Sequence, residues 1–222
     1  MSLTLTYLGH AGVLLEDDKH AVAIDPFLTG NPLAVKKAAD IRCKHVVVTH
    51  GHDDHLGDAA AIASANKGTV YANYDITQFL AGQGVATEAG NPGGKLKTDF
   101  GWIAFTQALH SSSVDGRYLG VACGVMVHLG GQTVYHCGDT GLFGDMQILG
   151  DIYRPDIALI PIGDRYTMGP ELASRAAEMI RPSIAIPIHF RTFPSLVQDA
   201  SGFKPKGVDV VVLKPGESLR RA

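Results

Sequence analysis

Cysteine is scarce in this chain. Its 222 residues include three cysteines, Cys43, Cys123 and Cys137. Because the number is odd and no Cys-x-x-Cys spacing occurs, the sequence offers neither a complete disulfide framework nor a thiolate zinc motif. Thiols stay reduced in the cytosol, so we expect three free cysteines and a cytoplasmic protein.

Long apolar runs and blocks of basic residues are also missing. No apolar run reaches the roughly 18 residues that a membrane-spanning helix needs. The stretch from Met1 to His10 alternates like a strand and lacks the charged start and long apolar core of a signal peptide. The formal net charge is −3, and the nearest approach to a basic block is the pair Lys36-Lys37. We therefore expect neither a membrane span nor a nucleic-acid partner.

The composition is that of an ordinary globular protein. Hydrophobic residues make up 45% of the chain and charged residues 18%. A chain of this length can form one sizeable domain with a large core, and no linker interrupts it. We therefore expect a single domain over residues 1–222.

Short apolar runs bounded by glycine and aspartate predict many strands. The runs are Leu3–Leu8, Val13–Glu16, Ala21–Ile24, His45–Thr49, Thr69–Ala72, Trp102–Leu109, Val121–Leu129, Thr133–Cys137, Ile157–Ile162, Ile184–Ile188 and Val208–Leu213. Helical patterns cover Leu56–Ala65, Ile76–Ala81 and Pro170–Ile180, and the glycine-rich residues 90–97 predict a turn-rich connection. Gly130-Gly131 between two strands predicts a hairpin. Hairpins mixed with single βα units indicate two mixed sheets packed together, with helices outside.

Histidine and aspartate recur where predicted strands end, at Asp25, His50, His110, Asp139 and His189. Strand ends are where sheet proteins commonly build sites. The densest cluster is the run from His50 to His55, which reads His-Gly-His-Asp-Asp-His. His50 and His52 are two apart in an extended segment, so their imidazoles point the same way and can share one metal. Asp54 and His55 begin the next helix and can serve a second metal. Imidazole with carboxylate suits Zn²⁺ best, with Mn²⁺, Fe²⁺ or Ni²⁺ as alternatives.

This run, followed by the separate His110, Asp139 and His189, resembles the motif pattern of the metallo-β-lactamase superfamily. Asp25 in Ala23-Ile24-Asp25-Pro26 would be its first motif. Leu8-Gly9-His10-Ala11 and Pro187-Ile188-His189-Phe190 are similar to segments of a bacterial and archaeal group of metal-dependent hydrolases related to ascorbate-6-phosphate lactonase. The resemblance extends from residue 5 to residue 213.

The resemblance implies a role for each of these residues and a fold. His50, His52 and His110 would bind one metal, Asp54, His55 and His189 would bind a second, and Asp139 would bridge the two. Asp25 would fix the ligand loop by hydrogen bonds rather than bind a metal itself. The implied fold is an α/β, four-layer αββα sandwich of two mixed sheets flanked by helices, with the site at one edge between the sheets.

His10 and Arg191 are further candidates for the site. The resembling group has a histidine at the position of His10, so we expect this residue near the metals, in contact with substrate or with a ligand. Arg191 follows His189 by two residues. Its guanidinium could grip a carboxylate or phosphate, since it presents a fork of donors, with a plain surface charge as the alternative.

Together these residues predict an enzyme, a dinuclear metal-dependent hydrolase. Two metals about 3.5–4 Å apart can share a hydroxide near neutral pH, and Asp54 can orient it and take its proton. Two dications, two ligand carboxylates and the hydroxide sum to a charge of about +1, which favours a compact anionic ester, lactone or phosphoester. Two other interpretations stay open: a redox enzyme of the di-iron or dioxygenase type on the same fold, and a non-catalytic metal-bearing binding or sensing protein. The oligomeric state also stays open, a homo-oligomer included.

Overall fold

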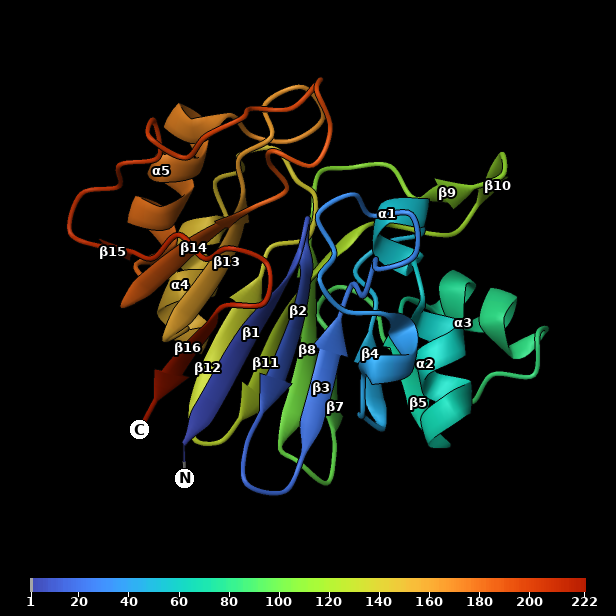
Figure 1. Ribbon diagram of the computed structural model, residues 1–222. Coiled ribbons are helices and arrows are strands. Elements are labelled where there is room, and N and C mark those ends of the chain that lie inside the picture. Colours follow the sequence, from blue (N-terminus) through green and yellow to red (C-terminus); the bar gives the residue numbers. More distant parts are fainter. Residues whose placement is uncertain (1) are drawn as a thin grey trace.

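The computed structural model describes residues 2–222; Met1, which opens the predicted N-terminal segment, lies outside them. Two seven-stranded sheets pack face to face, and helices cover the outer side of each (Figure 1). The expected four-layer αββα sandwich of two mixed sheets is confirmed. Within residues 2–222, no helix combines the length and the apolar character that crossing a bilayer demands.

The first sheet has the strand order β16-β1-β2-β3-β4-β5-β6. Its strands are β1 (Leu3–Gly9), β2 (Gly12–Glu16), β3 (Ala21–Ile24), β4 (His45–Val47), β5 (Thr69–Ala72), β6 (Thr87–Ala89) and β16 (Ser218–Arg221). Strands β1 to β3 form an antiparallel meander, and β3 to β6 run parallel. Helices α2 (Ala59–Asn66) and α3 (Tyr74–Ala81) lie on the outer face (Figure 1). Asn73 starts α3 by accepting a hydrogen bond from the Ile76 amide at 2.8 Å.

The second sheet repeats this plan with the order β15-β14-β13-β12-β11-β8-β7. Its strands are β7 (Lys95–Lys97), β8 (Trp102–Gln107), β11 (Cys123–Leu129), β12 (Gln132–His136), β13 (Ile157–Pro161), β14 (Ile184–Ile188) and β15 (Asp209–Val210). The strands from β7 to β12 pair antiparallel and those from β12 to β15 parallel, under helices α4 (Met146–Tyr153) and α5 (Pro170–Ile180). Gly130 and Gly131, at φ 60° and 80°, make the predicted hairpin turn between β11 and β12.

Most strands are buried on both faces, because the sandwich has three apolar layers. Side chains alternate along a strand, so Val13 and Leu15 of β2 enter the layer between the sheets while Leu14 faces the helices. In β13, Leu159 enters the same central layer and Ile160 packs toward α5. This double burial explains why the strands are continuous apolar runs in the sequence.

Several predicted element boundaries are wrong. Leu56–Ala65 is not one helix, because Gly57 at φ 41° separates the short α1 (Asp53–Leu56) from α2. The connection predicted over residues 90–97 contains strand β7, and only Asp209–Val210 of Val208–Leu213 forms a strand. Helix α4, strands β6 and β16, and the small hairpin of β9 (Ser113–Val114) and β10 (Arg117–Tyr118) were not predicted.

Candidate metal centre

The segment that runs from the end of β4 through α1 carries four of the predicted metal ligands. After β4 ends at Val47, the chain bends from Thr49 to His52 and then enters α1, which bears Asp54 and His55. A Cβ on Gly51 would lie 2.8 Å from the Leu119 side chain, so only glycine lets the loop pass at this point. His50 and His55 are fully buried. The loop therefore aims its ligands inward, at the edge of the sandwich where α1 lies (Figure 1).

The second sheet supplies the other three predicted metal ligands. His110 follows β8, Asp139 follows β12, and His189 comes directly after β14 with φ 55°. Gly138 precedes Asp139 at φ 61°, where a Cβ would meet the Cys123 carbonyl oxygen at 2.5 Å. Two groups of strand ends, one from each sheet, thus converge on one place.

The first group of ligand atoms belongs to His50, His52 and His110, and all of these atoms lie within 4.8 Å of one another. The His50 Nε2 and His52 Nδ1 atoms are 3.0 Å apart. Burial lowers the pKa of each of the three imidazoles below its usual value. Neutral imidazoles are the form that binds a metal.

The second group contains Asp54, His55 and His189, together with His10. Asp139 lies between the two groups: its Oδ1 is 3.3 Å from His55 Nε2, and its Oδ2 is 3.0 Å from His189 Nε2. The same Oδ2 is 3.5 Å from His110 Nε2, in the first group. Burial would raise the pKa of Asp139, but His189 and His55 outweigh it and hold this pKa well below its usual value.

The cluster passes a test of fit for metal ions. Among the described residues, His55 Nε2 and Asp139 Oδ1 are buried yet have no hydrogen-bond partner. Buried polar atoms are rarely left without a partner, and those that are need a specific explanation. Here both orphaned atoms are of the kinds that bind zinc, and both face the other ligand atoms. The His/Asp cluster is able to bind metal.

Asp25 positions two of these residues, His50 and His55, through hydrogen bonds, but it does not belong to either group of ligand atoms. Its carboxylate is fully buried and accepts three hydrogen bonds, from Thr49 N at 2.8 Å, Thr49 Oγ1 at 2.6 Å and His55 Nδ1 at 2.7 Å. Because the Thr49 hydroxyl donates to Asp25, it accepts from His50 Nδ1, 3.0 Å away. Both imidazoles therefore keep their proton on Nδ1 and present Nε2 to the cluster. Sequence reasoning missed Thr49, since a threonine at a strand end carries no signal of its own.

His10 lies beside the second group, fully buried. Its Nε2 is 3.1 Å from Asp54 Oδ2, and its Nδ1 is 2.9 Å from the hydroxyl of Thr192. The backbone carbonyl of His10 also accepts a hydrogen bond from His189 N at 2.7 Å. Burial lowers the pKa of His10 to about 4. Of the two roles expected for His10, the structure places it in contact with a ligand.

A cavity of about 490 Å³ opens onto the cluster. It is lined by His52, Asp54, His110, Ser111, Asp139, Tyr166, His189, Phe193, Ser195 and Leu196. Arg191 is not among these residues, because its Nε donates to the Gln198 carbonyl oxygen and its guanidinium lies over the ring of Phe190. The structure does not bring this arginine into the cavity. Tyr166, Phe193 and Leu196 were not anticipated, since they come from irregular loops without a periodic pattern.

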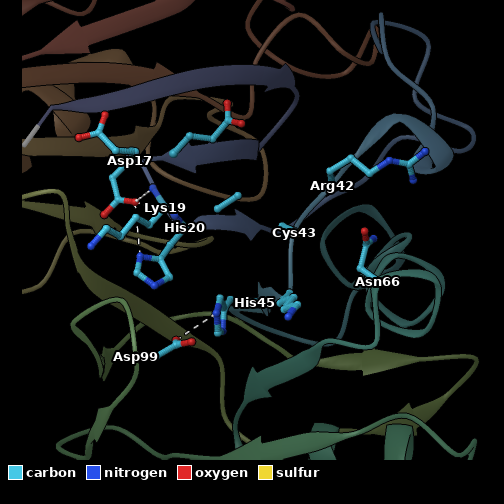
Figure 2. Close-up of a pocket in the computed structure, with 12 residues that line it drawn as sticks. Asp17, Lys19, His20, Arg42, Cys43, His45, Asn66 and Asp99 are labelled. Atoms are coloured by element: carbon cyan, nitrogen blue, oxygen red, sulfur yellow. Dashed lines mark hydrogen bonds and ion pairs between the residues drawn. The ribbon is translucent and has the colours of Figure 1, made fainter.

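A second cavity, of about 630 Å³, lies at the other ends of β3 and β4 (Figure 2). Its side chains are mixed in charge, and two of its histidines lie near carboxylates. His45 Nε2 is 3.2 Å from Asp99 Oδ1, and His20 Nδ1 is 3.4 Å from Asp17 Oδ1. The strands that start at this cavity end at the metal centre, so the two sites are separated by the length of a strand.

Comparison with known proteins agrees with this geometry. Residues 4–189 match the family model described as the β-lactamase superfamily domain. The chain belongs to the metallo-β-lactamase superfamily. A UPF0173 metal-dependent hydrolase of Thermus thermophilus is 45% identical to it over 219 residues, which cover 96% of this chain and 97% of the relative. A UPF0173 metal-dependent hydrolase of Archaeoglobus fulgidus is 42% identical, over 97% of this chain and 98% of the relative.

Among solved structures, Igni18, a metallo hydrolase from the archaeon Ignicoccus hospitalis, superposes with a TM-score of 0.91 and 38% identity, covering 100% of this chain and 99% of that one. The fold, the His/Asp cluster and these relatives agree. This superfamily member is a metal-dependent hydrolase.

Proposed function

We propose that this chain binds two divalent metal ions, zinc in the first place, and hydrolyses a small ester, lactone or phosphoester. His50, His52 and His110 would hold one ion, and Asp54, His55 and His189 the other. The observation that carries the proposal is the position of Asp139, whose two oxygens face ligand atoms of both groups. A carboxylate so placed neutralises part of the charge of two neighbouring cations and keeps them together.

Two ions held in this way lower the pKa of water and polarise the oxygen of a carbonyl or phosphoryl group. Asp54 is suited to orient the attacking water and accept its proton. Its side chain is 29% exposed, whereas His10 beneath it is fully buried. The contact of its Oδ2 with His10 Nε2, at 3.1 Å, favours an orientation in which the carboxylate faces the cavity. Such an orientation is what general-base catalysis requires.

The charge of the site favours substrates that carry or develop negative charge at the reacting atom. Two dications with the carboxylates of Asp54 and Asp139 leave a net charge of about +2 before water is ionised. The cavity, at about 490 Å³, is of a size that holds a small molecule. A compact ester, lactone or phosphoester meets both requirements.

The test is a metal titration of chelator-stripped protein. Bound zinc would be counted by elemental analysis, and turnover would be followed with a chromogenic phosphodiester and with a lactone. We expect turnover to rise until about two ions are bound per chain. His20→Ala, in the distant cavity of Figure 2, is the control and should leave both readings unchanged. Saturation of both binding and turnover at one ion would overturn the dinuclear proposal.

A further inference from the structure

The cavity at the metal centre has two unlike sides. One side consists of the ligands, and the other of Ser111 and a group we name the outer wall: Tyr166, Phe193, Ser195 and Leu196. Leu196 is buried and Phe193 half-buried, whereas Tyr166 as a whole residue is 58% exposed. The outer wall comes from the loop that follows β13 and from the loop that follows β14, and His189 begins the second of these loops.

Hydrogen bonds fix the outer wall relative to the ligands. Val197 N donates to the Gly163 carbonyl oxygen at 3.2 Å, which joins the two loops. Met168 N donates to the carbonyl oxygen of Thr140, the residue after Asp139, at 3.1 Å. The ring of Phe193 stands edge-on to His10 with the ring centroids 5.6 Å apart. Two loops so joined form a preformed surface, which binds a ligand without first having to be ordered.

The outer wall carries no charge. None of the described residues that line the cavity is a lysine or arginine. Arg165 lies over the ring of Tyr166, with its guanidinium carbon 5.5 Å from the ring centre. The other nearby arginine, Arg191, contacts Phe190 and the backbone, as described above. An anionic substrate therefore finds opposite charge only at the metals, and its remaining atoms face the aromatic and aliphatic side chains and the hydroxyls of Ser111 and Ser195.

We infer that the substrate carries an uncharged apolar group, aryl or branched alkyl, next to the bond that is cleaved, and that Phe193, Tyr166 and Leu196 bind this group. The inference rests on the proposed function, because the metals are what anchor the reacting atoms. The expected substrates are then not compact anionic esters in general but esters and phosphoesters that carry one apolar substituent. A substrate with a second anionic group would place that charge against an apolar surface and lose its hydration without a partner.

The experiment measures binding rather than turnover. Phenylphosphonate and methylphosphonate share the group that binds the metals and differ only in the apolar substituent. Their dissociation constants for zinc-loaded protein would be measured by calorimetry. We expect phenylphosphonate to bind at least about tenfold more tightly, a difference of about 1.4 kcal/mol. Phe193→Ala should reduce this ratio to about threefold or less, and Phe193→Leu, which keeps most of the apolar volume, should give a value in between.

Tyr74→Ala is the matched control, because this tyrosine is 55% exposed on α3 and does not line the cavity. It should leave the ratio unchanged, whereas Tyr166→Ala should lower it. Equal binding of the two phosphonates by the wild-type protein, or an unchanged ratio in Phe193→Ala, would overturn the assignment of the outer wall while leaving the metal chemistry intact. If both phosphonates bound equally well without zinc, or if neither bound the zinc-loaded protein, the proposed function would be overturned together with this inference.

Discussion

Replacing Asp25 by asparagine tests how the metal centre is held, because it changes one atom of a buried network. The carboxylate accepts three hydrogen bonds and donates none. Asparagine has one oxygen and one NH₂ group in the same space. If the NH₂ group faces His55 Nδ1, it donates to that nitrogen, and the imidazole proton moves to Nε2. Since Nε2 is the atom that points to Asp139, the proton then blocks metal binding.

The opposite orientation of the asparagine amide is also unfavourable for folding. The NH₂ group then faces Thr49 N, so two donors meet in a fully buried place. An unsatisfied buried donor costs about 1–3 kcal/mol of folding free energy. Loss of a partner that orients a metal ligand typically lowers metal affinity by roughly 10–100-fold. We therefore expect Asp25→Asn to lower both the stability of the metal-stripped protein and its affinity for the second ion.

The assay combines urea unfolding of metal-stripped protein with a zinc competition titration. Asp58→Asn is the matched control, because Asp58 also accepts three hydrogen bonds, from Leu28 N, Thr29 N and Thr29 Oγ1, and touches no ligand. This control should lose stability and keep the metal affinity of the wild type. If Asp25→Asn bound both ions as tightly as Asp58→Asn does, the reasoning about the proton on His55 would be refuted.

Three further predictions follow from the same geometry. His52→Ala should lower the number of bound ions from about two to about one per chain, as counted by elemental analysis; an unchanged count would remove His52 from the ligand set. Asp54→Asn should reduce turnover of a chromogenic phosphodiester by roughly 10²-fold or more with an unchanged circular dichroism spectrum, and near-normal turnover would contradict its role as proton acceptor. Burial lowers the pKa of His55, but Asp139 and Asp25 outweigh it and raise this pKa well above its usual value, so zinc must displace a proton. Zinc affinity should therefore increase with pH below that raised pKa, and calorimetry in buffers of different protonation enthalpy should detect proton release; a heat independent of the buffer would contradict this.

The clustering of the first four candidate ligands could be predicted from the sequence because their signal is local, whereas His110, Asp139 and His189 were expected only from the resemblance. His50, His52, Asp54 and His55 lie within six residues, and the spacing itself states which side chains can point together. The resemblance implied that Asp25 fixes the ligand loop, but its partner could not be predicted, since Asp25 and Thr49 meet only through the pairing of β3 with β4. The same holds for the link between His10 and Asp54, which are 44 residues apart.

Errors in the predicted fold also arise where packing between distant segments decides the local structure. Helix α4 was missed because Gly150 lies in the middle of a short segment, and glycine weakens a helical pattern. The structure explains this glycine by close packing: a Cβ there would lie 2.3 Å from the Ile180 carbonyl oxygen. Arg191 was a candidate for substrate contact, with a surface charge as the alternative, because it is near His189 in the sequence. Its φ of 67° and its contact with Gln198 turn it elsewhere, and neither is visible in the order of residues.

The division of the ligands between two sheets has a consequence for synthesis of the chain. Four ligands lie between His50 and His55, and three follow at His110, Asp139 and His189. A chain synthesised only as far as β5 contains four of the seven candidate ligands and none of those that the second sheet supplies. Under the proposed ligand assignment, both groups of ligands are complete only once β14 and His189 have been made. We therefore expect the dinuclear site to form only after both sheets have folded, so that metal binding would report on the folded sandwich rather than on one local loop.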